Sequence, residues 1–68
     1  MNVTVNGESR ELGAGATVAS VVESLDVAPG ARGVAVAVDG EVVSRGRWAD
    51  TQLRDGSMVE VVAAIQGG

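Results

Sequence analysis

The residues most suited to taking part in a reaction are the last three, Gln66, Gly67 and Gly68. A terminal carboxylate, with a reference pKa of roughly 3.5, is ionised at neutral pH and is a weak electrophile. Acyl chemistry at Gly68 therefore requires activation, for example as an acyl-adenylate made from ATP in another enzyme's active site. Because Gly67 and Gly68 have no Cβ, we expect a flexible, narrow thread that can enter such a site. The alternative interpretation is a frayed, glycine-rich end without a role.

The composition argues against catalysis by the chain itself. Cys, His, Tyr, Phe and Lys are all absent, which removes nearly every common nucleophile and general base. We therefore predict a carried substrate with no metal and no bound cofactor, whose reactive group is the terminal carboxyl. Asp50 and Asp55 near Arg54 offer an acidic site as a weaker alternative to a solvated loop.

The charge and the absence of long apolar runs indicate the class of partner and the location. A net charge of −4 argues against nucleic acid and anionic membrane surfaces, and it favours partners with a basic docking face. The N-terminal residues lack a signal-peptide pattern, and no apolar run approaches the roughly 20 residues that span a bilayer. We expect a cytoplasmic protein.

The first half of the chain predicts a hairpin followed by a helix. Residues 2–6 alternate as a half-buried strand, Asn6-Gly7 is a type I′ turn signal, and a return strand follows at about 8–12. Thr17 is placed to cap a helix that ends near 26–27. Its apolar stripe has helical spacing: Val18, Val21, Val22 and Leu25.

The second half predicts three further strands. Residues 34–38 suit a central strand buried on both faces, and Asp39-Gly40 turns the chain into a short strand at 41–44. Residues 45–52 show no strand period, so we expect a loop that Trp48 pins against the body. The last strand runs from Met58 to Ile65.

This order of elements predicts an α+β fold of the β-grasp type. Residues 1–68 would form one domain, with a mixed sheet of four to five strands over one main helix and a flexible tail at 66–68. The predicted core consists of Val3, Val5, Leu12, Val18, Val21, Val22, Leu25, Val36, Val38, Val42, Leu53, Val59 and Val61.

Strand alternation also predicts a docking patch. If Val59 and Val61 point inward, Val62 and Ala64 lie on the opposite face of the last strand. Ala35 and Ala37 of the neighbouring strand would join them in a small apolar patch. We expect partner enzymes to dock there.

Several segments together resemble the sulfur carrier family of bacterial thiamine biosynthesis. They are the run from Val34 to Arg45, Trp48 after it, the turn Leu53-Arg54-Asp55-Gly56, and the ending Ala64-Ile65-Gln66-Gly67-Gly68. The resemblance covers the whole chain. Asp39 stands where many members have Asn, which retains the turn chemistry.

The resemblance implies a ubiquitin-like β-grasp and a role for the terminal glycines. It implies that an E1-like adenylyltransferase adenylates Gly68 with ATP, and that sulfur from cysteine converts Gly68 to a thiocarboxylate. Thiazole synthase would then receive the sulfur. The functional residues of the family carry over to Gly67 and Gly68.

Three alternative functions stay open at this point. The small subunit of molybdopterin synthase is also a β-grasp ending in Gly-Gly, but those chains are usually longer and tend to carry prolines before the glycines. A ubiquitin-like modifier would join Gly68 to target lysines and leave covalent conjugates. A non-covalent binding module would keep its function without Gly67 and Gly68.

Overall fold

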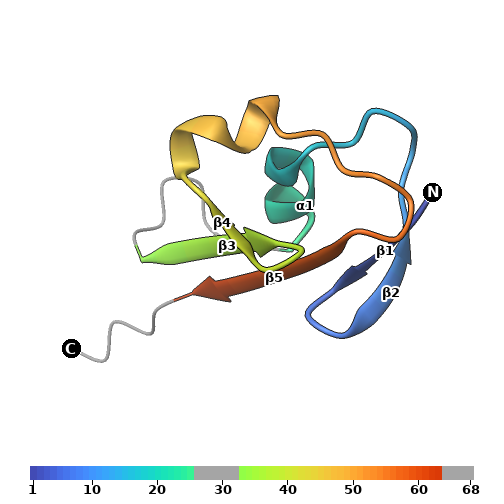
Figure 1. Cartoon of the computed structure of the whole chain (residues 1–68), viewed down its shortest axis with the longest axis horizontal. Coiled ribbons are helices and arrows are strands. Elements are labelled where there is room, and N and C mark those ends of the chain that lie inside the picture. Colours follow the sequence, from blue (N-terminus) through green and yellow to red (C-terminus); the bar gives the residue numbers. More distant parts are fainter. Residues whose placement is uncertain (26–32, 64–68) are drawn as a thin grey trace.

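The computed structural model describes residues 1–25 and 33–63, which form one mixed sheet with helical segments on one side (Figure 1). Along the chain, the elements are β1 (Asn2–Val5), β2 (Glu8–Glu11), α1 (Val18–Ser24), β3 (Val34–Val38), β4 (Glu41–Val43), η1 (Arg45–Asp50) and β5 (Met58–Ala63). The order of strands in the sheet is β2-β1-β5-β3-β4.

The last strand, β5, is the centre of the sheet. It pairs with β1 in parallel and with β3 antiparallel. The prediction that residues 34–38 form the central strand is therefore wrong, because β3 lies between β5 and β4. The prediction that they are buried on both faces is also wrong, since Val36 is buried whereas Ala35 is exposed. The small alanines at alternate positions mark the uncovered face.

Two tight turns build the hairpins, as the sequence predicts. Asn6 and Asp39 both have φ of 51°, and the glycines after them, Gly7 and Gly40, have φ of 83° and 86°. Positive φ at both central residues is the requirement of a type I′ turn, whose twist matches that of the flanking strands. The Asn-Gly and Asp-Gly signals are confirmed.

A capping box starts helix α1. The Thr17 side chain accepts a hydrogen bond from the backbone N–H of Ser20, and the Ser20 hydroxyl accepts one from the backbone N–H of Thr17. Val18, Val21 and Val22 are buried, as the predicted stripe requires. The helix is shorter than expected, because it ends at Ser24 with Leu25 as its C-cap; the predicted end at 26–27 lies outside the described residues.

Residues 45–50, predicted as a loop, instead form the 3₁₀ helix η1. Trp48 explains why this segment has a fixed shape. The residue is 9% exposed, and its indole Nε1 donates a hydrogen bond to the Val43 carbonyl over 2.9 Å. Arg45 lies over the ring, 5.1 Å from its centroid. The expectation that Trp48 pins this segment is confirmed.

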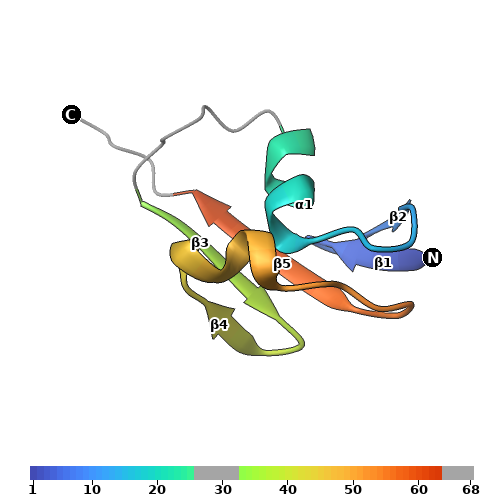
Figure 2. The same cartoon turned by 90° about the horizontal axis from the view of Figure 1, so that it is seen from above.

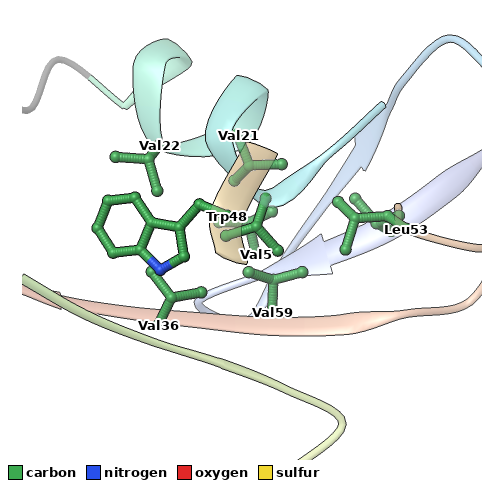
Figure 3. Packing of buried hydrophobic residues seen from close by; sticks show 9 residues of the cluster. Val5, Val21, Val22, Val36, Trp48, Leu53 and Val59 are labelled. Atoms are coloured by element: carbon green, nitrogen blue, oxygen red, sulfur yellow. The ribbon is translucent and has the colours of Figure 1, made fainter. Parts of the chain in front are cut away.

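The core lies between the sheet and the two helical segments, which cover the same face (Figure 2). In Figure 3 the Trp48 ring lies between Val22 of α1 and Val36 of β3. The buried hydrophobic residues are Val3, Val5, Val18, Val21, Val22, Val36, Trp48, Leu53 and Val59. Leu12, Leu25, Val38 and Val61 are partly buried against them.

The prediction that Val42 lies in the core is wrong, because this residue is 79% exposed. The register pairs Val36 with Val43 and Ala37 with Val42. Paired residues share a face of the sheet, so Val43 follows Val36 inward and Val42 follows Ala37 outward. Two adjacent valines give no hydrophobic alternation that would reveal this register from the sequence.

Candidate functional site

The predicted terminal site residues, Gln66, Gly67 and Gly68, lie outside the described residues, as does Ala64 of the predicted patch. The structure describes the part of the candidate site that precedes them. This part consists of the last described residues of β5, the strands beside it, and the sheet face that α1 and η1 leave open (Figure 1).

The predicted patch residues that the structure describes do come together. Ala35 pairs with Val62, and Ala37 pairs with Glu60, so β3 and β5 place these four side chains on the same face. Ala37 also pairs with Val42 of β4. The result is a surface that runs across three strands on the face opposite the core.

Val42 and Met58 were missed by the sequence-based prediction of this surface. The exposed fractions of the three large hydrophobic side chains on it are 79% for Val42, 62% for Val62 and 60% for Met58. The place of Met58 on this face could have been predicted from the alternation of side chains along β5, because Met58 is two residues from Glu60 and four from Val62. We call Ala35, Ala37, Val42 and Val62 the apolar patch; Met58 lies further back along β5.

Carboxylates supply the charge of the open face in the described strands. The side chains paired onto this face carry two charges, those of Glu60 beside the apolar patch and Glu11 on β2. Arg10 pairs with Val3 and so belongs to the other face. A surface with an apolar centre and acidic neighbours is complementary to an apolar partner surface that carries basic side chains.

Two turn residues tie β5 in place from opposite sides. On the β3 side, the Asp39 backbone N–H donates to the Met58 carbonyl over 2.8 Å, and Asp39 Oδ1 accepts from the Met58 N–H over 2.9 Å. On the β1 side, Asn6 Oδ1 accepts from the Val61 N–H over 2.8 Å, and Asn6 Nδ2 donates to the Val61 carbonyl over 3.2 Å. Side chains therefore hold β5 at its first residue, Met58, and at Val61.

The acidic residues near Arg54 have structural partners or face solvent. Asp55 Oδ1 accepts a hydrogen bond from the Asn2 backbone N–H over 2.8 Å, which ties the turn before β5 to the start of β1. Asp50 is exposed at the end of η1. Across residues 1–25 and 33–63, no cluster of three or more Asp, Glu, His or Cys side chains is arranged to hold a metal ion.

Membrane insertion through a helix finds no support in the described segments. Neither α1 nor η1 has the length and apolar character that a membrane-crossing helix needs.

Comparison with known protein families decides the relationship of this chain. The model of one family, described as the ThiS family, matches residues 3–68, which include the terminal glycines. The chain belongs to the ThiS family. The resemblance inferred from the internal motifs and the Gly-Gly ending is thereby confirmed.

Relatives of this ThiS family member include two curated proteins with different architectures. The sulfur carrier protein ThiS of Thermus thermophilus is 44% identical over 66 residues, which cover 97% of this chain and 98% of that protein. A thiazole synthase of Paramagnetospirillum magneticum is 37% identical over 68 residues. That match covers the whole of this chain but 20% of the thiazole synthase, so a ThiS-like segment is part of a longer polypeptide there.

A solved ThiS structure confirms the predicted fold. The crystal structure of the thiamine biosynthesis protein ThiS from Geobacter metallireducens superposes with a TM-score of 0.79 at 34% identity, over 100% of both chains. The α+β prediction of a β-grasp, with a mixed sheet over one main helix, is correct, and the sheet has five strands. This chain therefore shares with a ThiS protein both sequence similarity and the fold of the domain that precedes the terminal segment.

Proposed function

We propose that this chain is a sulfur carrier of thiamine biosynthesis and that the carboxyl group of Gly68 holds the sulfur. The observation that carries the proposal is the ThiS-family match through residues 3–68. The Thermus thermophilus relative that matches 97% of the chain is itself a sulfur carrier protein. The composition supports the same role, since no cysteine is present to carry sulfur on a side chain.

The chemistry follows from the terminal carboxylate. An E1-like adenylyltransferase joins the Gly68 carboxylate to the α-phosphate of ATP, and pyrophosphate leaves. A persulfide sulfur derived from cysteine then attacks the acyl carbon, and AMP leaves in place of the poor leaving group that the carboxylate would offer. Cleavage of the resulting sulfur–sulfur bond by a second thiol leaves a thiocarboxylate on Gly68.

Thiazole synthase is the proposed acceptor of the sulfur. In Paramagnetospirillum magneticum, a thiazole synthase polypeptide contains a segment similar to the whole of this chain, which supports a partnership between the two. A thiocarboxylate is a softer and better nucleophile than a carboxylate, as sulfur delivery to a carbonyl-type substrate requires.

The apolar patch is the proposed docking surface for the adenylating enzyme and for thiazole synthase. Val62 and Val42 leave large apolar areas exposed, and Ala35 and Ala37 between them allow close approach of a partner. The proposal includes Ala64, the predicted patch residue that lies outside the described residues. Glu60 beside the patch favours a partner surface with a basic side chain.

In this proposal the chain is a co-substrate of other enzymes and does not catalyse a reaction. It binds no cofactor and no metal, and ATP is consumed in the active site of the adenylating partner. A cytoplasmic location remains a prediction that accompanies this role.

An intact-mass experiment tests the proposal. The chain is incubated with its adenylating enzyme, ATP and a cysteine-derived persulfide donor, and fragmentation locates the change. We expect one oxygen to be exchanged for one sulfur at Gly68. The variant Gly68→Val should block the reaction, because a branched side chain crowds the channel that receives the terminus.

Gly13→Val is the matched control. Gly13 has open space where a Cβ would lie and no positive φ, so the same substitution there should leave the sulfur exchange intact. The proposal is wrong if active partner enzymes leave the mass unchanged, or if the added sulfur maps to an internal residue. Covalent conjugates on lysines of other proteins would instead support the ubiquitin-like modifier.

A further inference from the structure

The Asn6 side chain extends the pairing of β5 beyond the end of β1. The backbone N–H of Thr4 donates to the Ser57 carbonyl and that of Asn6 donates to the Val59 carbonyl, both over 2.9 Å. A regular parallel ladder would continue to Val61. At Asn6 the chain turns with φ of 51°, so the backbone leaves the ladder, and the side-chain amide bonds both Val61 groups in its place.

The choice of Asn at this turn matches a specific need. Gly, Asp and Asn all suit the positive φ, but only Asn offers both a donor and an acceptor. Asp39 occupies the equivalent position of the other hairpin, also at φ of 51°. There the backbone N–H already donates to the Met58 carbonyl, so an acceptor alone completes the pair, and Asp supplies it.

The location of the Asn6 bonds connects them to the reaction. They are the last hydrogen bonds toward the β1 side that β5 makes within residues 1–25 and 33–63. Gly68 is seven residues beyond Val61 in the sequence. Beyond Val61 the described part of β5 continues through Val62 and Ala63, which pair with β3, so the Asn6 amide is the contact on the β1 side that lies nearest to the terminus.

We propose that Asn6 is a positioning residue for the modification of Gly68. By bonding both backbone groups of Val61, its amide fixes the β1 side of β5 close to the last described residues of the strand. Asn6 does not touch the reacting atoms, and it lies outside the apolar patch. This inference rests on the proposed function, because it assigns to Asn6 a part in the adenylation of the same carboxylate.

The test compares variants at the two equivalent turn positions. Asn6→Gly keeps the positive φ and removes both bonds to Val61, whereas Asp39→Gly keeps the positive φ and removes the side-chain bond to Met58 at the other end of β5. Asn6→Asp keeps the acceptor and removes the donor. Pyrophosphate release by the adenylating enzyme gives kcat and KM for each variant, at a temperature where Trp48 fluorescence shows each to be folded.

We expect Asn6→Gly to lower kcat about tenfold, because small misplacements of a reacting group cost rate steeply. KM should change less than about twofold, since the docking surface is intact. Asn6→Asp should fall between Asn6→Gly and the unaltered chain, and Asp39→Gly should keep the original kcat. A purely structural role would lower the stability of the variants without separating them in kcat.

The results that overturn the inference differ from those that overturn the function. If the unaltered chain is adenylated and Asn6→Gly keeps its kcat, Asn6 is not a positioning residue. The same follows if Asp39→Gly loses kcat equally, or if Asn6→Gly raises KM alone. If the unaltered chain is not adenylated at all, the proposed function itself is wrong.

Discussion

The substitution Val62→Glu should separate docking from folding. Val62 lies on the open face of β5, opposite Ala35, with 62% of its side chain exposed in the free protein. Because the side chain contributes little to the core, the free energy of unfolding should fall by less than about 1 kcal/mol. Urea unfolding followed by the fluorescence of Trp48, the single aromatic residue, measures this.

The effect on partner affinity should be much larger. Complete burial of a valine side chain is worth about 1.5 kcal/mol, so covering the exposed part of Val62 in an interface contributes about 0.9 kcal/mol. A carboxylate buried at the same place without a partner costs a further 1 to 2 kcal/mol, roughly. At about 1.4 kcal/mol per factor of ten, the Kd for the adenylating enzyme should rise roughly 20- to 100-fold.

Isothermal titration calorimetry measures the Kd, and Ser9→Glu serves as the charge-matched control. Ser9 is exposed on β2, where it pairs with Thr4 and so belongs to the same face, two strands away from β5. We expect this control to change the Kd less than about threefold at physiological salt, because exposed charges at that distance are screened. An unchanged Kd for Val62→Glu, or equal weakening by both variants, would refute the docking assignment.

Three further outcomes are expected. Deleting Gly67 and Gly68 should leave the thermal unfolding curve unchanged and abolish sulfur transfer; a clear loss of stability would show that these residues pack against the body. Trp48→Phe should lower the free energy of unfolding by about 1 to 3 kcal/mol in urea, because it leaves the Val43 carbonyl without the indole N–H and opens a gap in the core. Thr17→Ala should cost about 1 kcal/mol in the same assay by removing the helix cap, with adenylation kinetics unchanged.

The local signals in this sequence predicted most of the fold. Asn6-Gly7 and Asp39-Gly40 fixed the turns because few residues tolerate positive φ, and the helix stripe was visible because three valines bury on one side. The order of the strands was harder to predict, since pairing of β5 with both β1 and β3 depends on contacts between residues far apart in the chain. For the same reason β3 was placed at the centre incorrectly.

The candidate site could be predicted only in part. The alternation of side chains along a strand correctly placed Val62 on the face opposite the core. It also placed Ala35 and Ala37 on one face, because they are two residues apart. Their position beside Val62 depends on the register between β3 and β5, which no local pattern encodes. Val42 was missed because the valine after it made either register equally apolar. The second role of Asn6 was hidden, because its turn signal is the same whether or not the amide reaches Val61.

The outer strands of the sheet have a consequence for behaviour at high concentration. A protein that exposes apolar side chains invites self-association, and an unpaired strand edge would let copies add to one another in long sheets. Here β4 has three residues, and β2 consists of Glu8, Ser9, Arg10 and Glu11, so one edge is short and the other is charged. We therefore expect the free carrier to resist polymerisation through its edges while its open face stays available to the enzymes that it serves.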